Sequence, residues 1–148
     1  MVLKCASWVL LIVMFLLCSS YKRLAVYDLK IKITGIRNDK GSIQLHVYSN
    51  SNQFETKTPT ISYRITKYGK VNNGILEFND AKLEEGVYGI ALLDDENNNT
   101  KMDYGWLLPL EGYAFSDYYH TGFTHPGFEQ FKFNLNADQQ ITMKIRYM

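Results

Sequence analysis

The sequence predicts an all-β protein, an antiparallel β-sandwich of about seven or eight strands. Three observations support this prediction: short segments alternate apolar and polar residues with a period of two, turn residues separate them, and no window has a helical period longer than a turn or two. Such alternation buries one face of a strand and exposes the other. The clearest alternating segments are 29–34, 42–47, 131–135 and 141–147, and further strands are expected at 61–68, 75–78 and 87–93.

The residues between the predicted strands are typical of turns, as expected for short antiparallel strands. Residues 37–41, with the sequence Arg-Asn-Asp-Lys-Gly, predict a hairpin turn between the first two strands. Asparagine and glycine separate further strands at 72–74, and two glutamates and a glycine precede the strand at 87–93. Residues 136–138 separate the last two strands, and residues 80–83 are expected to form one short helical turn.

Length and composition are typical of one folded domain, predicted at residues 21–148. The 148 residues are 46% hydrophobic and 14% aromatic, which is enough for a substantial apolar core. Removing the first twenty residues takes away only Lys4 among the charged groups and leaves 15 basic and 15 acidic side chains. A neutral domain offers no electrostatic reason to bind nucleic acid or an anionic membrane surface.

Residues 1–20 have the features of a signal peptide. Lys4 precedes an uninterrupted apolar stretch at 8–17, which is short for a membrane span and is followed by two serines. We therefore expect an extracytoplasmic protein, which is periplasmic, cell-surface or secreted. The alternative is an uncleaved leader, which would be the only membrane attachment. Both cysteines, Cys5 and Cys18, lie in this leader, so the mature domain is expected to have no disulfide and no cysteine ligand.

The segment after the apolar run 87–93 carries oxygen-bearing side chains at alternate positions. In the order of a calcium-binding loop, the candidate ligands are Asp95, Asn97, Asn99, the carbonyl of Lys101, and Asp103. Position 12 of such a loop is Trp106, which cannot bind calcium, so Glu111 or Asp94 would have to complete the shell. Position 6 is Thr100, where the turn favours glycine. The same residues also suit an ordinary polar turn between strands. Calcium is therefore one of two interpretations, and we expect any binding to be weak.

Residues 104–128 do not alternate and are rich in aromatic residues, glycine and proline. A loop this long is unusual in a compact domain unless it is functional or packs on its own side chains. Its aromatic residues would either stack on a sugar or other flat ligand, or cover one end of the sandwich. The candidate ligand-binding residues are Trp106, Glu111, Tyr113, Tyr118 and Tyr119.

Catalysis has little support in the sequence. No nucleophile elbow, zinc-protease helix or phosphate-binding glycine loop is present. Asp117, His120 and Glu111 could form an acid–base group, and His120, His125 and Asp117 could share a metal ion, but no spacing requires either. We expect a protein without enzymatic activity and assign no catalytic residue.

These motifs, in this order, resemble the exported bacterial proteins of the family called domain of unknown function 2141. The resemblance rests on residues 34–41, 86–91, 95–103, 111–116 and 126–129, with Trp106 and Pro109 between them. It implies an immunoglobulin-like or prealbumin-like sandwich behind a signal peptide, without an established activity. The chain has Thr100 where the family loop commonly has glycine.

The sequence as a whole predicts an exported, non-enzymatic binding or structural module, with calcium ordering of the loop at 95–103 as one of the two interpretations of that loop. The alternative is a domain that binds a glycan or small ligand through residues 104–128. The expected partner is an envelope protein, a glycan or a small ligand, and calcium is the one candidate cofactor.

Overall fold

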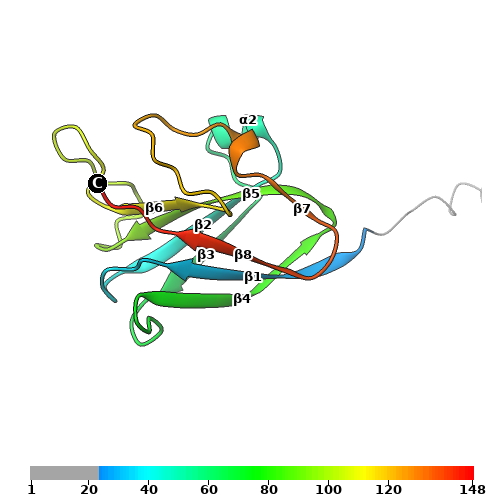
Figure 1. Cartoon of the computed structure of the whole chain (residues 1–148), viewed down its shortest axis with the longest axis horizontal. Coiled ribbons are helices and arrows are strands. Elements are labelled where there is room, and N and C mark those ends of the chain that lie inside the picture. Colours follow the sequence, from blue (N-terminus) through cyan, green and yellow to red (C-terminus); the bar gives the residue numbers. More distant parts are fainter. Residues whose placement is uncertain (1–23) are drawn as a thin grey trace, which may run out of the picture.

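The computed structural model describes residues 24–148, and the predicted signal peptide at 1–20 lies outside the described residues. Two sheets pack face to face (Figure 1), which confirms the predicted all-β sandwich. One sheet has the strand order β4-β1-β8, and the other has the order β3-β2-β5-β6, with β7 also paired to β5. The elements are β1 (Val26–Thr34), β2 (Ser42–Tyr48), α2 (Ser51–Glu55), β3 (Ile61–Thr66), β4 (Ile75–Glu84), β5 (Gly86–Asp95), β6 (Gly112–Phe115), the 3-10 turn η1 (Phe128–Gln130), β7 (Phe133–Leu135) and β8 (Gln139–Lys144).

The core between the sheets follows the alternation in the sequence. Leu29, Ile31 and Ile33 of β1 are fully buried, and the intervening residues face outward or lie at partly exposed positions. Strand β1 is antiparallel to β4 but parallel to β8, with Ile31 opposite Ile141. The parallel pair departs from the predicted antiparallel pattern. It is possible because the chain reaches β8 from the other sheet and not through a hairpin.

Two local predictions are wrong. Residues 37–41 do not form a hairpin, because β1 and β2 belong to different sheets and this segment crosses between them. Residues 80–83 are not a helical turn but part of β4. There the register shifts from Leu29 opposite Ala81 to Ile31 opposite Phe78, which leaves one extra residue on β4. Asp80, the first residue of the predicted turn, therefore lies at a β-bulge.

The short helix α2 was not predicted, because five residues are too few to show a helical period. Asn50 caps its first turn by accepting a hydrogen bond from the N–H of Gln53 at 3.0 Å. Phe54 of this helix packs edge-on against Phe131, with ring centroids 4.9 Å apart. Figure 1 shows α2 beside the segment that carries η1, both over the five-stranded sheet. Within residues 24–148, no helix is both long enough and apolar enough to span a membrane.

A second, aromatic core covers the outer face of the five-stranded sheet. Tyr48, Phe115, Phe128 and Phe131 are buried there. Gly89 of β5 provides the space for these rings, because a Cβ atom at this position would lie 2.6 Å from Phe131 and 2.8 Å from Phe128. Part of the aromatic segment is therefore core, which explains why β2 and β5 are buried on both faces.

Candidate functional site

The candidate site is the loop of residues 96–111, which connects β5 to its antiparallel neighbour β6. At the base of this loop, Asp94 lies opposite Gly112. Successive side chains of a strand point to opposite faces, and the contacts of Asp94 and Asp95 follow this rule. Asp95 contacts Gln44 and the loop on the outer face, whereas Asp94 contacts Lys67 at the end of the sandwich interior.

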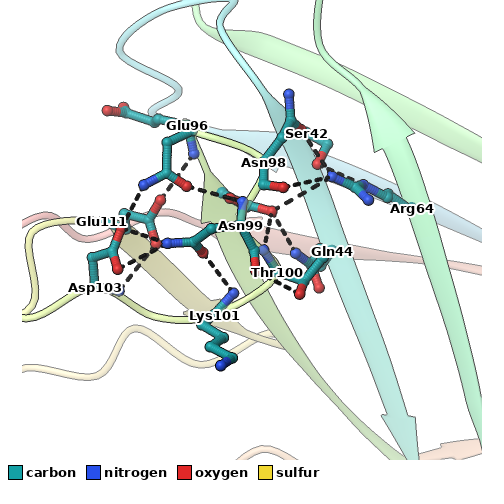
Figure 2. Close-up of polar contacts among 12 residues, drawn as sticks. Ser42, Gln44, Arg64, Glu96, Asn98, Asn99, Thr100, Lys101, Asp103 and Glu111 are labelled. Carbon is teal, nitrogen blue, oxygen red and sulfur yellow. Dashed lines mark hydrogen bonds and ion pairs between the residues drawn. The ribbon is translucent and has the colours of Figure 1, made fainter.

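Asp95 organises the first half of the loop. Its carboxylate accepts hydrogen bonds from the N–H groups of Asn99 and Thr100, both at 3.0 Å, and from the side chain of Gln44 at 2.7 Å. Arg64 of β3 lies 3.8 Å from the same carboxylate and donates to the Asn98 side chain at 3.0 Å. Figure 2 shows the loop closing over these groups of β2 and β3. The loop is thus anchored on the sheet.

Asn97, Asn99 and Asp103 form the centre of the loop. The side-chain oxygens of Asn97 and Asn99 accept from the N–H groups of Asn99 and Lys101, at 3.0 and 2.8 Å. Each is an Asx turn, in which a side chain folds back on its own backbone. The amide nitrogens of both asparagines donate to the carboxylate of Asp103, at 2.6 and 2.9 Å. The sequence-predicted side chains at 95, 97, 99 and 103 are therefore brought together, while the Lys101 side chain is exposed.

Glu111 closes the loop at its far end. Its carboxylate accepts from the N–H groups of Glu96 at 3.0 Å and Asp103 at 3.2 Å. Burial raises the pKa of Glu111 above its usual value, and the nearby carboxylates of Asp103 and Asp95 raise it further. Glu111 thus belongs to this loop, although the sequence analysis also grouped it with the aromatic ligand-binding residues.

Two residues of the loop have left-handed backbone conformations. Asn98 has a φ of 62°, which asparagine tolerates well. Thr100 has a φ of 69°, where its β-branched side chain is disfavoured. The prediction that the turn favours glycine at Thr100 agrees with this geometry.

The donor set has the chemistry of a site for a hard cation. Carboxylate, amide and backbone carbonyl oxygens are the ligands that calcium prefers. Oδ1 of Asp95 and Oδ1 of Asp103 each accept one hydrogen bond and keep a second lone pair, whereas Oδ2 of each residue accepts two. Within residues 24–148, no three acidic, histidine or cysteine side chains form a group that could hold a metal ion. A cation here would therefore require the asparagine oxygens. Asp94, which the sequence offered to complete the shell, is directed to Lys67.

A buried polar network lies beneath the loop. Nζ of Lys67 lies 2.5 Å from Oδ1 of Asp94, and both side chains are fully buried. The hydroxyl of Tyr147 donates to the other carboxylate oxygen of Asp94 at 2.5 Å. Burial raises the pKa of Asp94 and opposes the lowering by Lys67 and Tyr147. The sequence analysis missed this network. The signal was available, because Lys67 is in phase with the inward-facing Ile65, and Asp94 is in phase with Ile90 and Leu92.

The segment between β1 and β2 joins the network to the loop. Arg37 donates two hydrogen bonds to Glu96, at 2.6 and 2.8 Å, and its guanidinium lies 4.2 Å from the centroid of the Tyr147 ring. The bond from Arg37 is the main reason why the pKa of Glu96 is lowered. Gly41 has a φ of +72°, and a Cβ atom there would lie 2.0 Å from the carbonyl oxygen of Asp95. Glycine is therefore required where this segment crosses the loop.

The predicted ligand-binding aromatic residues do not share one surface. Trp106 is 95% exposed at the tip of the loop, and Tyr119 is about half exposed beside Lys144. The Tyr118 hydroxyl accepts from Gln130, and Tyr113 packs edge-on against Phe115. Of these four aromatic residues, only Tyr113 lines the cavity described next.

A cavity of about 700 Å³ lies between the outer face of the five-stranded sheet and the aromatic segment. Its wall is mainly apolar and includes Tyr48, Phe54, Tyr113 and Phe115. Leu107, Leu108 and Phe123 also line it and remain exposed to solvent. Three histidines add polar atoms to the wall: His46, His120 and His125. Burial lowers the pKa of His46, which favours its neutral form.

The side chains considered for catalysis or for a histidine metal site bind separate partners. Asp117 accepts a hydrogen bond from the N–H of Thr142 at 2.7 Å, and Nε2 of His120 lies 2.5 Å from the carbonyl oxygen of Thr124. Glu111 binds the loop backbone, as described above. In the described part of the chain, no hydrogen bond joins any two of these three residues.

Comparison with known proteins agrees with the resemblance noted in the sequence. Neither the curated proteins nor the solved structures contain a match to this chain. A family model described as "Uncharacterized protein conserved in bacteria (DUF2141)" matches residues 31–143, a region that includes the five-stranded sheet, most of the three-stranded sheet and the entire loop. The chain therefore belongs to the DUF2141 family.

Proposed function

We propose that this protein is an extracytoplasmic, non-enzymatic binding module whose loop at residues 95–103 is ordered by calcium. The observation that carries the proposal is the pair of consecutive Asx turns at Asn97 and Asn99, which follow the loop-anchoring Asp95. In a calcium loop of the EF-hand type, positions 1, 3 and 5 supply side-chain oxygens. Those positions are Asp95, Asn97 and Asn99.

The arrangement also supports a role for the cation in joining the two halves of the loop. Asp103 is held by amide nitrogens of Asn97 and Asn99, and Glu111 binds the backbone on either side of the loop. A bound calcium ion would supply positive charge close to Glu111, whose pKa is raised by burial and by the carboxylates of Asp103 and Asp95. Two neutral amides and a missing bidentate ligand at position 12 predict a dissociation constant of about 10⁻⁴–10⁻³ M.

A melting experiment tests the calcium site. At about ten times the dissociation constant, calcium should stabilise the fold by about 1.4 kcal/mol, which raises the midpoint by about 5 °C for a domain of this size. Asp103→Asn should abolish the shift, because it removes a carboxylate while retaining its shape. A matched variant with Asp80→Ala, an exposed acidic residue outside the loop, should retain the shift. A midpoint that is equal in calcium and in chelator would rule out the site.

The second candidate function is the binding of a small apolar ligand. The cavity of about 700 Å³ supports it, because small-molecule sites have volumes of about 300–1,000 Å³ and mainly apolar walls. A partly enclosed apolar cavity suits such a ligand better than a glycan, which needs many polar contacts. The aromatic dye anilinonaphthalene sulfonate is a suitable probe. Tyr113→Ala should weaken its binding, whereas Tyr119→Ala, outside the cavity wall, should not. Equal dye binding by both variants would reject this cavity as the site.

The extracytoplasmic location rests on the leader at residues 1–20. Its apolar stretch is too short for an ordinary membrane span and has the length of a signal-peptide core. Separation of the cell envelope from the cytoplasm, followed by intact-mass measurement of the protein in each fraction, tests this proposal. A cleaved leader supports export, whereas the complete chain found in the cytoplasm would contradict it.

A further inference from the structure

Lys67 and Asp94 form a close contact in which both side chains are fully buried. Nζ of Lys67 lies 2.5 Å from Oδ1 of Asp94, and the exposed fraction of both side chains is 0%. Despite this short distance, Oδ1 accepts no hydrogen bond of acceptable geometry from any group in residues 24–148. The amine therefore approaches the carboxyl group in an orientation that differs from an ordinary ion pair.

Polar side chains surround both the amine of Lys67 and the carboxyl group of Asp94. The Tyr147 hydroxyl donates to Oδ2 of Asp94, the oxygen that Lys67 does not contact. Nζ of Lys67 donates to Oδ1 of Asn38 at 3.3 Å, and the amide of Asn38 donates to Glu96 at 2.8 Å. Glu96 is in turn neutralised by Arg37. A buried amine and a buried carboxyl group are thus held in contact with a hydrogen-bond donor on the carboxyl oxygen.

We propose that Lys67 and Asp94 become joined by an intramolecular amide bond between Nζ of the lysine and Cγ of the aspartate. The reaction takes place between the neutral amine and the neutral carboxylic acid, which one proton transfer within the buried contact produces. The neutral amine has a free electron pair and is the nucleophile. Water is the product of the reaction, and its exclusion from the buried site favours the amide.

The reaction balances without any co-reactant. One proton passes from the lysine ammonium to the aspartate carboxylate, which produces the neutral pair. The amine nitrogen then forms a bond to Cγ, and the Tyr147 hydroxyl stabilises the negative charge that develops on Oδ2. The second proton moves from nitrogen to Oδ1, the bond between Cγ and Oδ1 breaks, and one water molecule leaves. The nitrogen keeps one proton, and no electrons are gained or lost overall.

The cross-link would join two strands that are not neighbours. Lys67 follows the end of β3, Asp94 lies in β5, and β2 pairs with both strands between them. The bond would therefore fasten β3 to β5 across β2, next to the base of the candidate calcium loop. Its function would be to hold the strands at this end of the five-stranded sheet together, in a chain whose two cysteines both lie outside the described residues.

Tryptic digestion of the purified wild-type protein tests the proposal directly. The cross-link blocks cleavage after Lys67, so peptide 65–70 should remain attached to peptide 83–101, with a total mass one water molecule below the sum of the two. Tandem mass spectrometry should place the branch at Lys67 and Asp94. If only the free peptides 65–67, 68–70 and 83–101 are recovered, the proposal is wrong.

Three variants separate the reaction from general effects on folding. Lys67→Arg retains a positive charge but lacks a nucleophilic amine, so the branched peptide should disappear, whereas Lys70→Arg at an exposed neighbouring position should retain it. Tyr147→Phe should lower the cross-linked fraction after a fixed time from synthesis, because Tyr147 positions and stabilises the carboxyl group. A branched peptide that persists in Lys67→Arg would show that another lysine reacts and would overturn the assignment.

Discussion

Asp94 and Asp95 are adjacent in the sequence but point to opposite faces of the five-stranded sheet. Asp94 binds Lys67 and Tyr147 at the end of the sandwich interior, whereas Asp95 binds Gln44 and the backbone of the loop. Both carboxylates are fully buried. The end of β5 therefore stabilises the body of the fold with one side chain and shapes the candidate calcium site with the next.

Replacing Lys67 by methionine should destabilise the protein strongly. It leaves the Asp94 carboxylate buried without a counter-charge, which costs about 3–5 kcal/mol. The double change Lys67→Met with Asp94→Leu removes this carboxylate and should recover the part of the loss that its burial causes. Urea denaturation of the wild type, Lys67→Met and the double variant measures the free energy of unfolding of each protein. Lys82→Met provides the control, because Lys82 is 68% exposed in its ion pair with Asp28. Equal losses for Lys67→Met and Lys82→Met would contradict the role of the buried pair.

Thr100→Gly should stabilise the loop by about 1 kcal/mol. Threonine has a φ of 69° at this position, and glycine adopts such a conformation without steric cost. The same change should strengthen calcium binding, because the loop is then closer to its bound form. Thermal melting and a calcium titration measure the two effects. Thr124→Gly, at a position without positive φ, should not stabilise the protein, and a gain there of the same size would refute the explanation.

The aromatic core on the outer face should contribute as much to stability as an ordinary core. Phe131 is 2% exposed and contacts Phe54, Phe115 and Phe128. Phe131→Ala should therefore cost about 3–5 kcal/mol. Phe123→Ala is the matched control, because Phe123 is 88% exposed and its loss should cost little. Denaturant midpoints of the two variants should differ clearly, and similar midpoints would show that this cluster is not a core.

Gly89→Ala should destabilise the protein by about 1–3 kcal/mol through overpacking. The added Cβ atom would lie 2.6 Å from Phe131, so the aromatic rings would have to move. Gly127→Ala is a suitable comparison, since no atom lies within 4 Å of its Cβ position and its φ is negative. Calorimetric midpoints test the difference. A neutral Gly89→Ala variant would mean that Phe128 and Phe131 do not pack against β5 as described.

Acid should weaken the contact between Arg37 and Glu96. The folded-state pKa of Glu96 lies below its unfolded value, mainly because of the hydrogen bonds from Arg37. The stabilisation is therefore complete above the unfolded pKa of about 4.3 and is lost as the pH falls through the folded pKa. Glu96→Gln should remove about 0.5–1 kcal/mol at neutral pH and flatten the stability profile below pH 5. Glu77→Gln, at an exposed position, should leave the profile unchanged, and an unaltered profile in Glu96→Gln would exclude this contact as its source.

The strands were predictable because their alternation is a local property. Leu29, Ile31 and Ile33 mark the inward face of β1 without reference to the rest of the chain. The pairing of the strands was not predictable in the same way. Residues 37–41 have the composition of a hairpin turn, but turn residues indicate only that the chain changes direction. They do not indicate whether it returns to the same sheet or crosses to the other one.

The side chains that meet in the candidate loop were predictable from the sequence. Side chains at alternate positions of a short loop point to the same side and therefore converge. The sequence by itself thus determined the all-β class, most of the strands and the residues of the loop, because each depends on interactions between near neighbours. Only the tertiary structure decided that Lys67 meets Asp94, that Arg37 meets Glu96, and that the aromatic segment forms a second core. Those contacts join residues that are distant in the chain, and their formation depends on how the two sheets stack.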